Sequence, residues 1–239
     1  MTTVGEIKIK VTAELNQHNV SDFQFEAISL IGHVLGIKQT QVIVENQIEL
    51  TNKQEHDIKI LLNKRIKGKP LAYLINEKFF YNEKFFVNEN VLIPRQETEE
   101  LIDYFFLTNK HESMQNKNIL DIGTGSGIIS IICKKKYPES NVFSIDKSNK
   151  AICVAKKNAL EKNLSIEFDI ADIKDCKIDK IDYVISNPPY IKTNTIKKLQ
   201  KEVLNEPKIA LDGGIEGLSI IHKIFEWEKN INKNNALKI

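Results

Sequence analysis

A short apolar segment that runs into three closely spaced glycines constrains the fold of this chain more than any other feature. Residues 118–122 have the composition of a buried parallel strand, and Gly123, Gly125 and Gly127 follow it. The apolar residues 128–134 predict a helix whose first backbone N–H groups point at the glycine loop. This order predicts an α/β fold with a ligand at the turn. A tight turn without a ligand is the simpler alternative.

The glycine spacing excludes two common nucleotide-binding loops. Position 128 is Ile, so the loop lacks the G-x-G-x-x-G pattern of dinucleotide binders, and it also lacks the G-K-[ST] pattern of a phosphate loop. Asp121 lies two residues before the first glycine, where its carboxylate would repel a pyrophosphate and attract a sulfonium and an ammonium group. The loop therefore favours a cationic ligand such as S-adenosylmethionine.

A second acid ends the next predicted strand, residues 141–145. Asp146 stands nineteen residues after Gly127. In doubly wound folds an acid at this place accepts hydrogen bonds from both ribose hydroxyls of a nucleoside, because a carboxylate has two acceptor oxygens. We predict this role for Asp146, with capping of the helix that begins near Ser148 as the alternative.

A third acid follows the third predicted strand, residues 165–168. Asp172 lies where proteins of this kind often hold the adenine amine, and Asp169 and Asp175 compete for the same role.

The motif Asn187-Pro188-Pro189-Tyr190 follows a further apolar strand, about sixty residues after the glycine loop. The Asn187 side-chain oxygen and the Pro188 carbonyl can each accept one N–H from the same NH₂ group, which orients it and favours pyramidal nitrogen. The prolines stiffen the loop, and Tyr190 offers a flat face to a planar group. The two motifs together predict an S-adenosylmethionine enzyme that methylates an amide or amine nitrogen.

The sequence resembles the release factor glutamine methyltransferases of the HemK/PrmC type, which methylate the glutamine of the Gly-Gly-Gln loop in peptide chain release factors. The resemblance extends from about residue 20 to the end, and the Ile-Pro-Arg-x-Glu-Thr-Glu segment is specific to this group. Besides the two motifs, it includes residues 69–74, 79–80, 85–87, 92–102 and 206–218.

The resemblance implies a site without a metal. The implied cofactor-binding residues are Asp121, Gly123, Thr124, Gly125, Ser126, Gly127, Asp146, Asp172 and Asn187. The implied substrate-binding residues are Asn187, Pro188, Pro189 and Tyr190, of which Asn187, Pro188 and Tyr190 are also catalytic. Ile173 stands where many members have an aromatic residue or Leu, so the adenine contact departs from the family pattern.

We predict three parts: a helical substrate-binding domain at 1–72, a β-hairpin linker at 73–95 and a Rossmann-like methyltransferase domain at 96–239. In the first part, Ser21 or Asp22 can cap a helix that Gly36 ends. Thr51, with a glutamine three residues later, has the signature of a capping box.

The linker prediction depends on the aromatic alternation from residue 74 to 93, which is broken at residues 82–83. Arg95, Glu97 and Glu99 follow it. They are either residues that help to close the two domains over the cofactor or the solvated start of a helix.

Composition is consistent with a two-domain cytoplasmic protein. The start of the chain lacks the features of a signal peptide, and no apolar segment has transmembrane length. Three widely spaced cysteines indicate neither disulfides nor zinc. The 34 basic and 32 acidic residues give a net charge of +2, too balanced for a protein that grips many phosphates of a nucleic acid.

The carboxyl end predicts an incomplete sheet. Residues 217–230 read as a helix and residues 235–239 as the beginning of a fifth strand, where methyltransferases of this class continue to seven strands. We expect the fourth strand and the faces of two helices to expose apolar surface, which favours low stability or association.

Three functional hypotheses follow. The first is glutamine methylation on release factors. The second is methylation of exocyclic amines in nucleic acid, which uses the same Asn-Pro-Pro-Tyr geometry but is opposed by the near-neutral charge. The third is an inactive truncated remnant.

Overall fold

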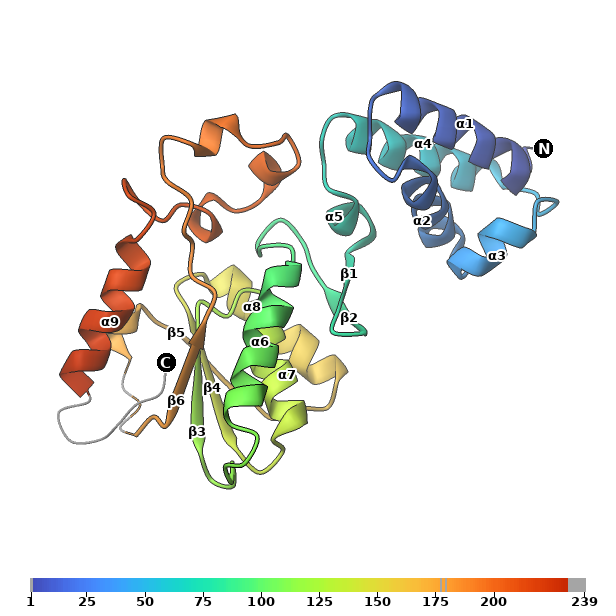
Figure 1. Cartoon of the computed structure of the whole chain (residues 1–239). Helices are drawn as coiled ribbons and strands as arrows, with labels where there is room; N and C mark the ends of the chain where they lie inside the picture. The colour runs from blue at the N-terminus through green and yellow to red at the C-terminus, as the bar shows by residue number, and fades with distance from the viewer. Residues whose placement is uncertain (1, 177, 179, 232–239) are drawn as a thin grey trace. The chain divides into compact units, whose positions relative to one another are not determined.

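The computed structural model of the chain describes residues 2–176, 178 and 180–231 (Figure 1). It divides into two compact units, Met1–Asn76 with Lys201–Asn205, and Glu77–Gln200 with Glu206–Ile239. The predicted helical domain, residues 1–72, lies within the first unit, and the predicted linker, residues 73–95, is shared between the two. No helix in the described ranges is both long and apolar enough to cross a membrane.

The first unit is helical, as predicted. Its helices are α1 (Val4–Gln17), α2 (Phe23–Leu35), α3 (Gln39–Val44), α4 (Asn52–Ile66) and α5 (Leu71–Ile75). Their apolar faces form one core that includes Ile7, Val11, Leu15, Ala27, Ile31, Ile58 and Leu62.

The helix ends of this unit test the capping predictions. The capping box of α4 is confirmed, because the Gln54 N–H donates to Thr51 Oγ1 and the Thr51 N–H donates to Gln54 Oε1. Gly36 ends α2 with a φ of 67°, also as predicted. Asp22, one of the two predicted alternatives, is the N-cap residue of α2, but its side chain makes no capping hydrogen bond and its backbone is left-handed, with a φ of 48°.

A buried ion-pair network joins α2 and α4 to the segment Lys201–Asn205. The Arg65 guanidinium donates to both carboxylate oxygens of Glu26 and, at 2.9 Å, to Glu202 Oε1. Burial alone would lower the pKa of Arg65, but Glu26 and Glu202 outweigh it and raise the pKa above its ordinary value. The buried charge of Arg65 requires carboxylate partners, and Glu202 is one of them. This ion pair explains why segment Lys201–Asn205 belongs to the first unit.

The predicted hairpin is present but shorter than residues 74–93. Strands β1 (Glu77–Phe80) and β2 (Glu83–Phe86) pair antiparallel around a two-residue turn. Both turn residues, Tyr81 and Asn82, have positive φ, as a tight hairpin turn requires.

The second unit contains a parallel sheet in the order β5-β4-β3-β6. Its strands are β3 (Asn118–Ile122), β4 (Asn141–Asp146), β5 (Glu167–Ile170) and β6 (Tyr183–Ser186). The predicted strands at 118–122 and 141–145 are confirmed, whereas the third lies two residues later than predicted. A doubly wound α/β fold is thereby confirmed.

Helices cover both faces of this sheet (Figure 1). On one face, α6 (Gln96–Thr108), α7 (Ile128–Lys136) and α8 (Asn149–Glu161) share a core with Ile119 and Ile185. On the other face, α9 (Ser219–Ile231) packs through Ile224 and Trp227 against Leu120 and Val184. The strand residues alternate between the two cores because successive side chains of a strand point to opposite faces.

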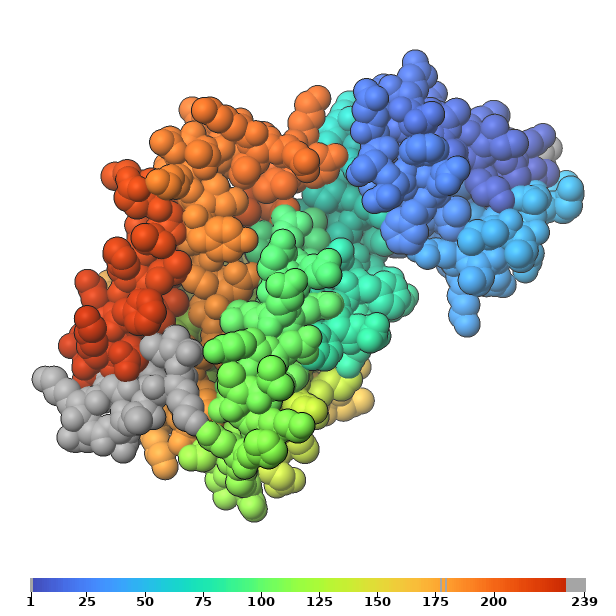
Figure 2. Space-filling view, in the orientation of Figure 1, coloured from blue at the N-terminus to red at the C-terminus, as the bar shows by residue number. Residues whose placement is uncertain are grey.

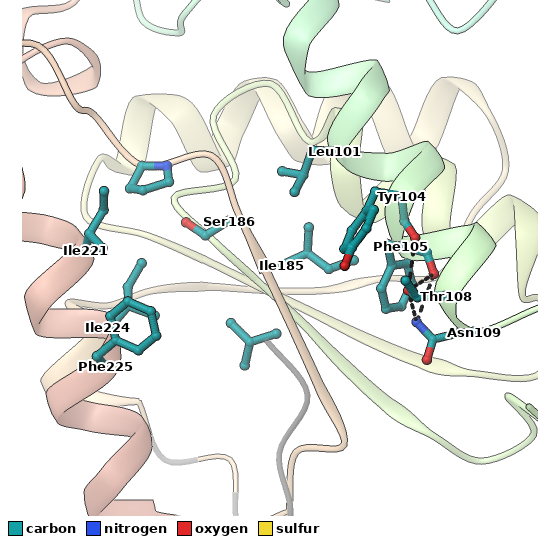
Figure 3. Close-up of a pocket in the computed structure, with 12 residues that line it drawn as sticks. Leu101, Tyr104, Phe105, Thr108, Asn109, Ile185, Ser186, Ile221, Ile224 and Phe225 are labelled. Carbon is teal, nitrogen blue, oxygen red and sulfur yellow. Dashed lines mark hydrogen bonds between the residues drawn. The ribbon is translucent and has the colours of Figure 1, made fainter.

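Strand β6 lies at one edge of the four strands found in the described residues. Beside it is a cavity of about 650 Å³, with α6 on one side and α9 on the other (Figure 3). Tyr104 of α6 and Phe225 of α9 line it and are exposed, which agrees with the apolar surface expected here. Helix α9 confirms the helix predicted at 217–230, and the fifth strand predicted to begin at 235–239 lies outside the described residues.

Candidate functional site

The glycine loop lies between β3 and α7, and its three glycines have different structural roles. Gly123 and Gly125 have φ values of 73° and 56°, and a Cβ on either would meet no atom closer than 3.9 Å. A Cβ on Gly127 would lie 3.0 Å from Ala155 Cβ. The first two glycines therefore keep the loop open toward a ligand, while Gly127 permits α7 to pack against α8.

Asp121 braces this loop from within the protein. Its side chain is fully buried, and Oδ2 accepts from the Thr124 hydroxyl at 2.6 Å and from the Ser130 N–H at 3.3 Å. Oδ1 has no hydrogen-bond partner among the described residues. Burial, and to a smaller extent the charge of Asp146, raises the pKa of Asp121 to about 7. A cation bound nearby would favour the ionised carboxylate.

Asp146 holds the other side of the loop from the end of β4. Its Oδ2 accepts from the Gly125 N–H at 3.0 Å, and its Oδ1 accepts from the Ser148 N–H at 2.9 Å. Ser148 itself caps α8 by accepting from the Ala151 N–H, so the helix does not need Asp146 as its N-cap. Each carboxylate oxygen retains a lone pair for a further donor.

Asp172 lies in the loop after β5, next to Lys147. The Lys147 ammonium is 2.8 Å from Asp172 Oδ2, and this hydrogen bond lowers the pKa of Asp172. Asp172 lines the same pocket as Asp146, whereas Asp169 lines a separate one. The position therefore favours Asp172 over Asp169 for the predicted contact with the adenine amine.

Asn187 directly follows β6 and reaches the same pocket. The preceding Ser186 hydroxyl donates to the Ile122 carbonyl at 2.7 Å, which ties the ends of β6 and β3 together. The Asn187 side-chain NH₂ donates to Thr98 Oγ1 at 2.9 Å. Tyr190, three residues further on, is 58% exposed.

The described residues that line this pocket come from the carboxyl ends of the strands, from the loops around them and from helices α8 and α9. They are Asn90, Val91, Leu92, Ile122, Gly123, Gly125, Ile145, Asp146, Lys147, Ser148, Ala151, Ala171, Asp172, Ile173, Asn187, Pro189, Ile209, Ala210, Ile220 and Lys223. The structure thus brings together six predicted site residues: Gly123, Gly125, Asp146, Asp172, Asn187 and Pro189. It places Asp121, Thr124, Ser126, Gly127 and Tyr190 outside this lining, and Pro188 in the cavity beside β6.

Sequence reasoning did not find the residues that hold the two loops over the pocket. Glu206 is buried, and its carboxylate accepts from the Ile93 N–H at 3.0 Å and from the Arg95 guanidinium. This joins the loop that contains Leu92 to the segment that contains Ile209. Both segments resemble segments of the release factor glutamine methyltransferases, and this resemblance could have marked them as functional. The spacing of residues in the sequence did not show that the two segments pair.

The segment at 211–217 packs directly on the backbone of the Asn-Pro-Pro-Tyr loop. A Cβ on Gly213 would lie 2.7 Å from the Pro189 carbonyl oxygen and 2.8 Å from Tyr190 Cα, and a Cβ on Gly217 would lie 2.4 Å from the Tyr190 carbonyl oxygen. The Ile191 N–H donates to the Leu211 carbonyl, and the Gly213 N–H donates to the Ile191 carbonyl. The glycines therefore set the position of the loop that follows Asn187.

We expect Gly213→Ala to impair this loop. The added methyl group would meet only backbone atoms, so the loop must shift, and a displaced acceptor is expected to lower kcat/KM for methyl transfer about tenfold or more. Glu216→Ala is the control, since Glu216 is exposed and bonds only to Lys192 among the described residues. Equal kcat/KM in Gly213→Ala and the unaltered chain would show that the loop position is not critical.

Comparisons with known proteins match both parts of the chain. Residues 103–233 match the family model "Methyltransferase small domain", and residues 6–75 match "PrmC N-terminal domain". A release factor glutamine methyltransferase of Thermodesulfovibrio yellowstonii is 42% identical over 91% of this chain and 80% of its own length. The chain belongs to the release factor glutamine methyltransferase family. Its cofactor is S-adenosylmethionine.

Two further relatives have the same name. The protein of Flavobacterium psychrophilum is 39% identical over 84% of this chain and 73% of its own length. The protein of Haemophilus influenzae is 30% identical over 94% of this chain and 82% of its own length. Among solved structures, the hMettl16 catalytic domain in complex with the MAT2A 3'UTR hairpin 6 has a TM-score of 0.51 at 15% identity, over 72% of this chain and 73% of that one. That likeness shows the fold alone.

The pocket fits the cofactor of this family. The open backbone at Gly123 and Gly125 leaves room for close approach, and the Asp146 carboxylate has spare acceptor capacity for two ribose hydroxyls. Ala171 and Ile173 add apolar lining suited to an adenine ring. Ile173 is buried here, so the departure from the family pattern keeps an apolar wall at this place.

Proposed function

We propose that this chain transfers a methyl group from S-adenosylmethionine to the side-chain amide nitrogen of the glutamine in the Gly-Gly-Gln loop of peptide chain release factors. The observation that supports it most is the meeting of Asn187 and Pro189 with Gly123, Gly125 and Asp146 in one pocket. A pocket shared by the residues proposed for target and cofactor supports direct transfer between them. The cytoplasm is the proposed compartment, since release factors act there.

The proposed chemistry depends on placement. When bound, S-adenosylmethionine supplies an electrophilic methyl carbon on a positively charged sulfur. Asn187 Oδ1 and the Pro188 carbonyl each accept one N–H of the glutamine amide, which turns the nitrogen lone pair toward that carbon. The nitrogen–carbon bond forms as the carbon–sulfur bond breaks. A general base is not needed beforehand, because the amide proton becomes acidic only on the methylated, cationic nitrogen.

A protein loop suits the surface around this pocket. Segment 191–218 lies after β6 and reaches the surface (orange in Figure 2). Three of its apolar side chains, Ile209, Ile215 and Leu218, are exposed, as is Tyr190 just before it. Apolar side chains exposed beside a pocket suit a protein partner. The two glycines before the target glutamine give the partner loop the freedom to enter a narrow site.

The proposal is tested with labelled S-adenosylmethionine and a purified release factor. We expect one methyl group on the glutamine of the Gly-Gly-Gln loop, located by mass spectrometry. A release factor with Glu in place of that glutamine should take up no label, because oxygen replaces the NH₂ group. Label in DNA or RNA but not in the release factor would overturn the choice of substrate. Absence of label in all of them would favour an inactive remnant.

A further inference from the structure

Thr98 contacts the proposed catalytic side chain from the first turn of α6. Its hydroxyl oxygen accepts from the Asn187 side-chain NH₂ at 2.9 Å, across a sequence separation of 89 residues. Thr98 is only 2% exposed, although it is polar. At this depth water cannot readily replace the Thr98 hydroxyl as the partner of the Asn187 NH₂ group.

In this geometry the bond engages the Asn187 NH₂ group and leaves Oδ1 available to a ligand. A primary amide carries an oxygen acceptor and an NH₂ donor of almost the same shape, and half a turn about its last torsion exchanges them. The target glutamine presents an NH₂ group, which only an acceptor can hold. With the Asn187 NH₂ engaged by Thr98, Oδ1 is the free atom, and among the described residues no hydrogen bond to it is recorded.

Thr98 is well placed to hold this orientation. It stands on a helix whose residues Ile102 and Phe105 are buried in the core against the sheet, so its backbone is fixed. Its β-branched side chain has few accessible rotamers, which further limits the position of the hydroxyl. A site built this way holds its acceptor before the substrate arrives.

We propose that Thr98 is a positioning residue that fixes the orientation of the Asn187 amide, so that Oδ1 faces the substrate NH₂ group. Thr98 itself does not touch the reacting atoms. The inference rests on the proposed function, since it assumes that Asn187 holds the target amide.

Thr98→Val tests the inference, because valine matches the shape of threonine and lacks the hydroxyl. We expect kcat for methylation of a release factor to fall about tenfold to a hundredfold, as for other lost orienting contacts. Cofactor affinity by calorimetry and the Tm should change little, and Thr98→Ser, which keeps the hydroxyl, should recover most of the rate. Thr108→Val is the matched control on the same helix, since among the described residues the Thr108 hydroxyl bonds only to carbonyls of its own helix and to Asn109.

A double variant separates positioning from a general effect on structure. If Thr98 acts through Asn187, Thr98→Val should not lower the rate further in an Asn187→Ala background. An additional tenfold loss in that background, or full kcat in Thr98→Val alone, would overturn the inference. If Thr98→Val does not fold, Thr98→Ala gives the same test, because it removes the hydroxyl without placing a methyl group where the hydroxyl was.

The outcomes also distinguish this inference from the proposed function. Full turnover of Asn187→Ala on a release factor would remove the role of Asn187 and with it the role of Thr98. An inactive Asn187→Ala together with a fully active Thr98→Val would leave the proposed function intact and remove only the positioning role.

Discussion

Asn187→Ala is expected to lower kcat for methyl transfer to a release factor by about a hundredfold or more while cofactor affinity is nearly retained. The substitution removes the acceptor that orients the target NH₂ group. Asn187 is one of twenty described residues that line the pocket, and it bonds to Thr98 and not to the glycine loop. The substitution should therefore lower the rate of the chemical step, which single-turnover assays at saturating cofactor measure.

The control for this prediction is Asn194→Ala. Asn194 is an exposed asparagine seven residues further along the chain, so its removal should leave turnover unchanged. Calorimetry on both variants shows whether the cofactor still binds. A large loss of cofactor affinity in Asn187→Ala would mean that the residue serves mainly the cofactor, and unchanged turnover would remove it from the reaction.

The sequence alone predicted the parts of the fold that depend on neighbouring residues. The strand at 118–122, its glycine turn and the helix after it have clear local patterns, and the capping box at Thr51 needs only the residue three positions later. Helix α1 has the same kind of box, from Thr3 to Glu6, but it was not predicted. Residue type predicted Asp22 as a possible cap, but not its left-handed backbone or the absence of a side-chain capping hydrogen bond.

The sequence predicted which residues form the site, but it did not predict the contacts between them. Asp121 was expected to face the ligand because of its charge, but the structure buries it against Thr124 and Ser130, where it braces the loop. Its role as a cofactor ligand stays a prediction. The bonds from Thr98 to Asn187 and from Arg95 to Glu206 join residues about ninety and about one hundred and ten positions apart, and no periodicity or spacing reports such pairs.

Arg95 and Glu99 illustrate the same limit. Their sequence context allowed either closure of the two domains or a solvated helix start. In the structure the Arg95 guanidinium pairs with Glu206, and Glu99 accepts from the Tyr81 N–H at 2.7 Å at the turn of the hairpin. Both residues thus serve contacts within the second unit, which only the tertiary fold could define.

Asp146→Ala is expected to weaken S-adenosylmethionine binding by about 2 to 4 kcal/mol, from the usual strength of hydrogen bonds to a charged group. Two losses act in the same direction. The variant lacks the acceptor oxygens for the ribose hydroxyls, and it also frees the Gly125 N–H that Asp146 now holds at 3.0 Å, so the glycine loop loses part of its support.

A graded series tests whether the carboxylate itself carries this affinity. Asp146→Asn keeps one acceptor oxygen without the charge, so its Kd should lie between those of the unaltered chain and Asp146→Ala. Asp169→Ala is the matched control, because Asp169 is an exposed acid at the end of the neighbouring strand and lines a different pocket. Calorimetry measures all three variants. An Asp146→Ala Kd equal to that of Asp169→Ala would show that the Asp146 carboxylate does not bind the ribose.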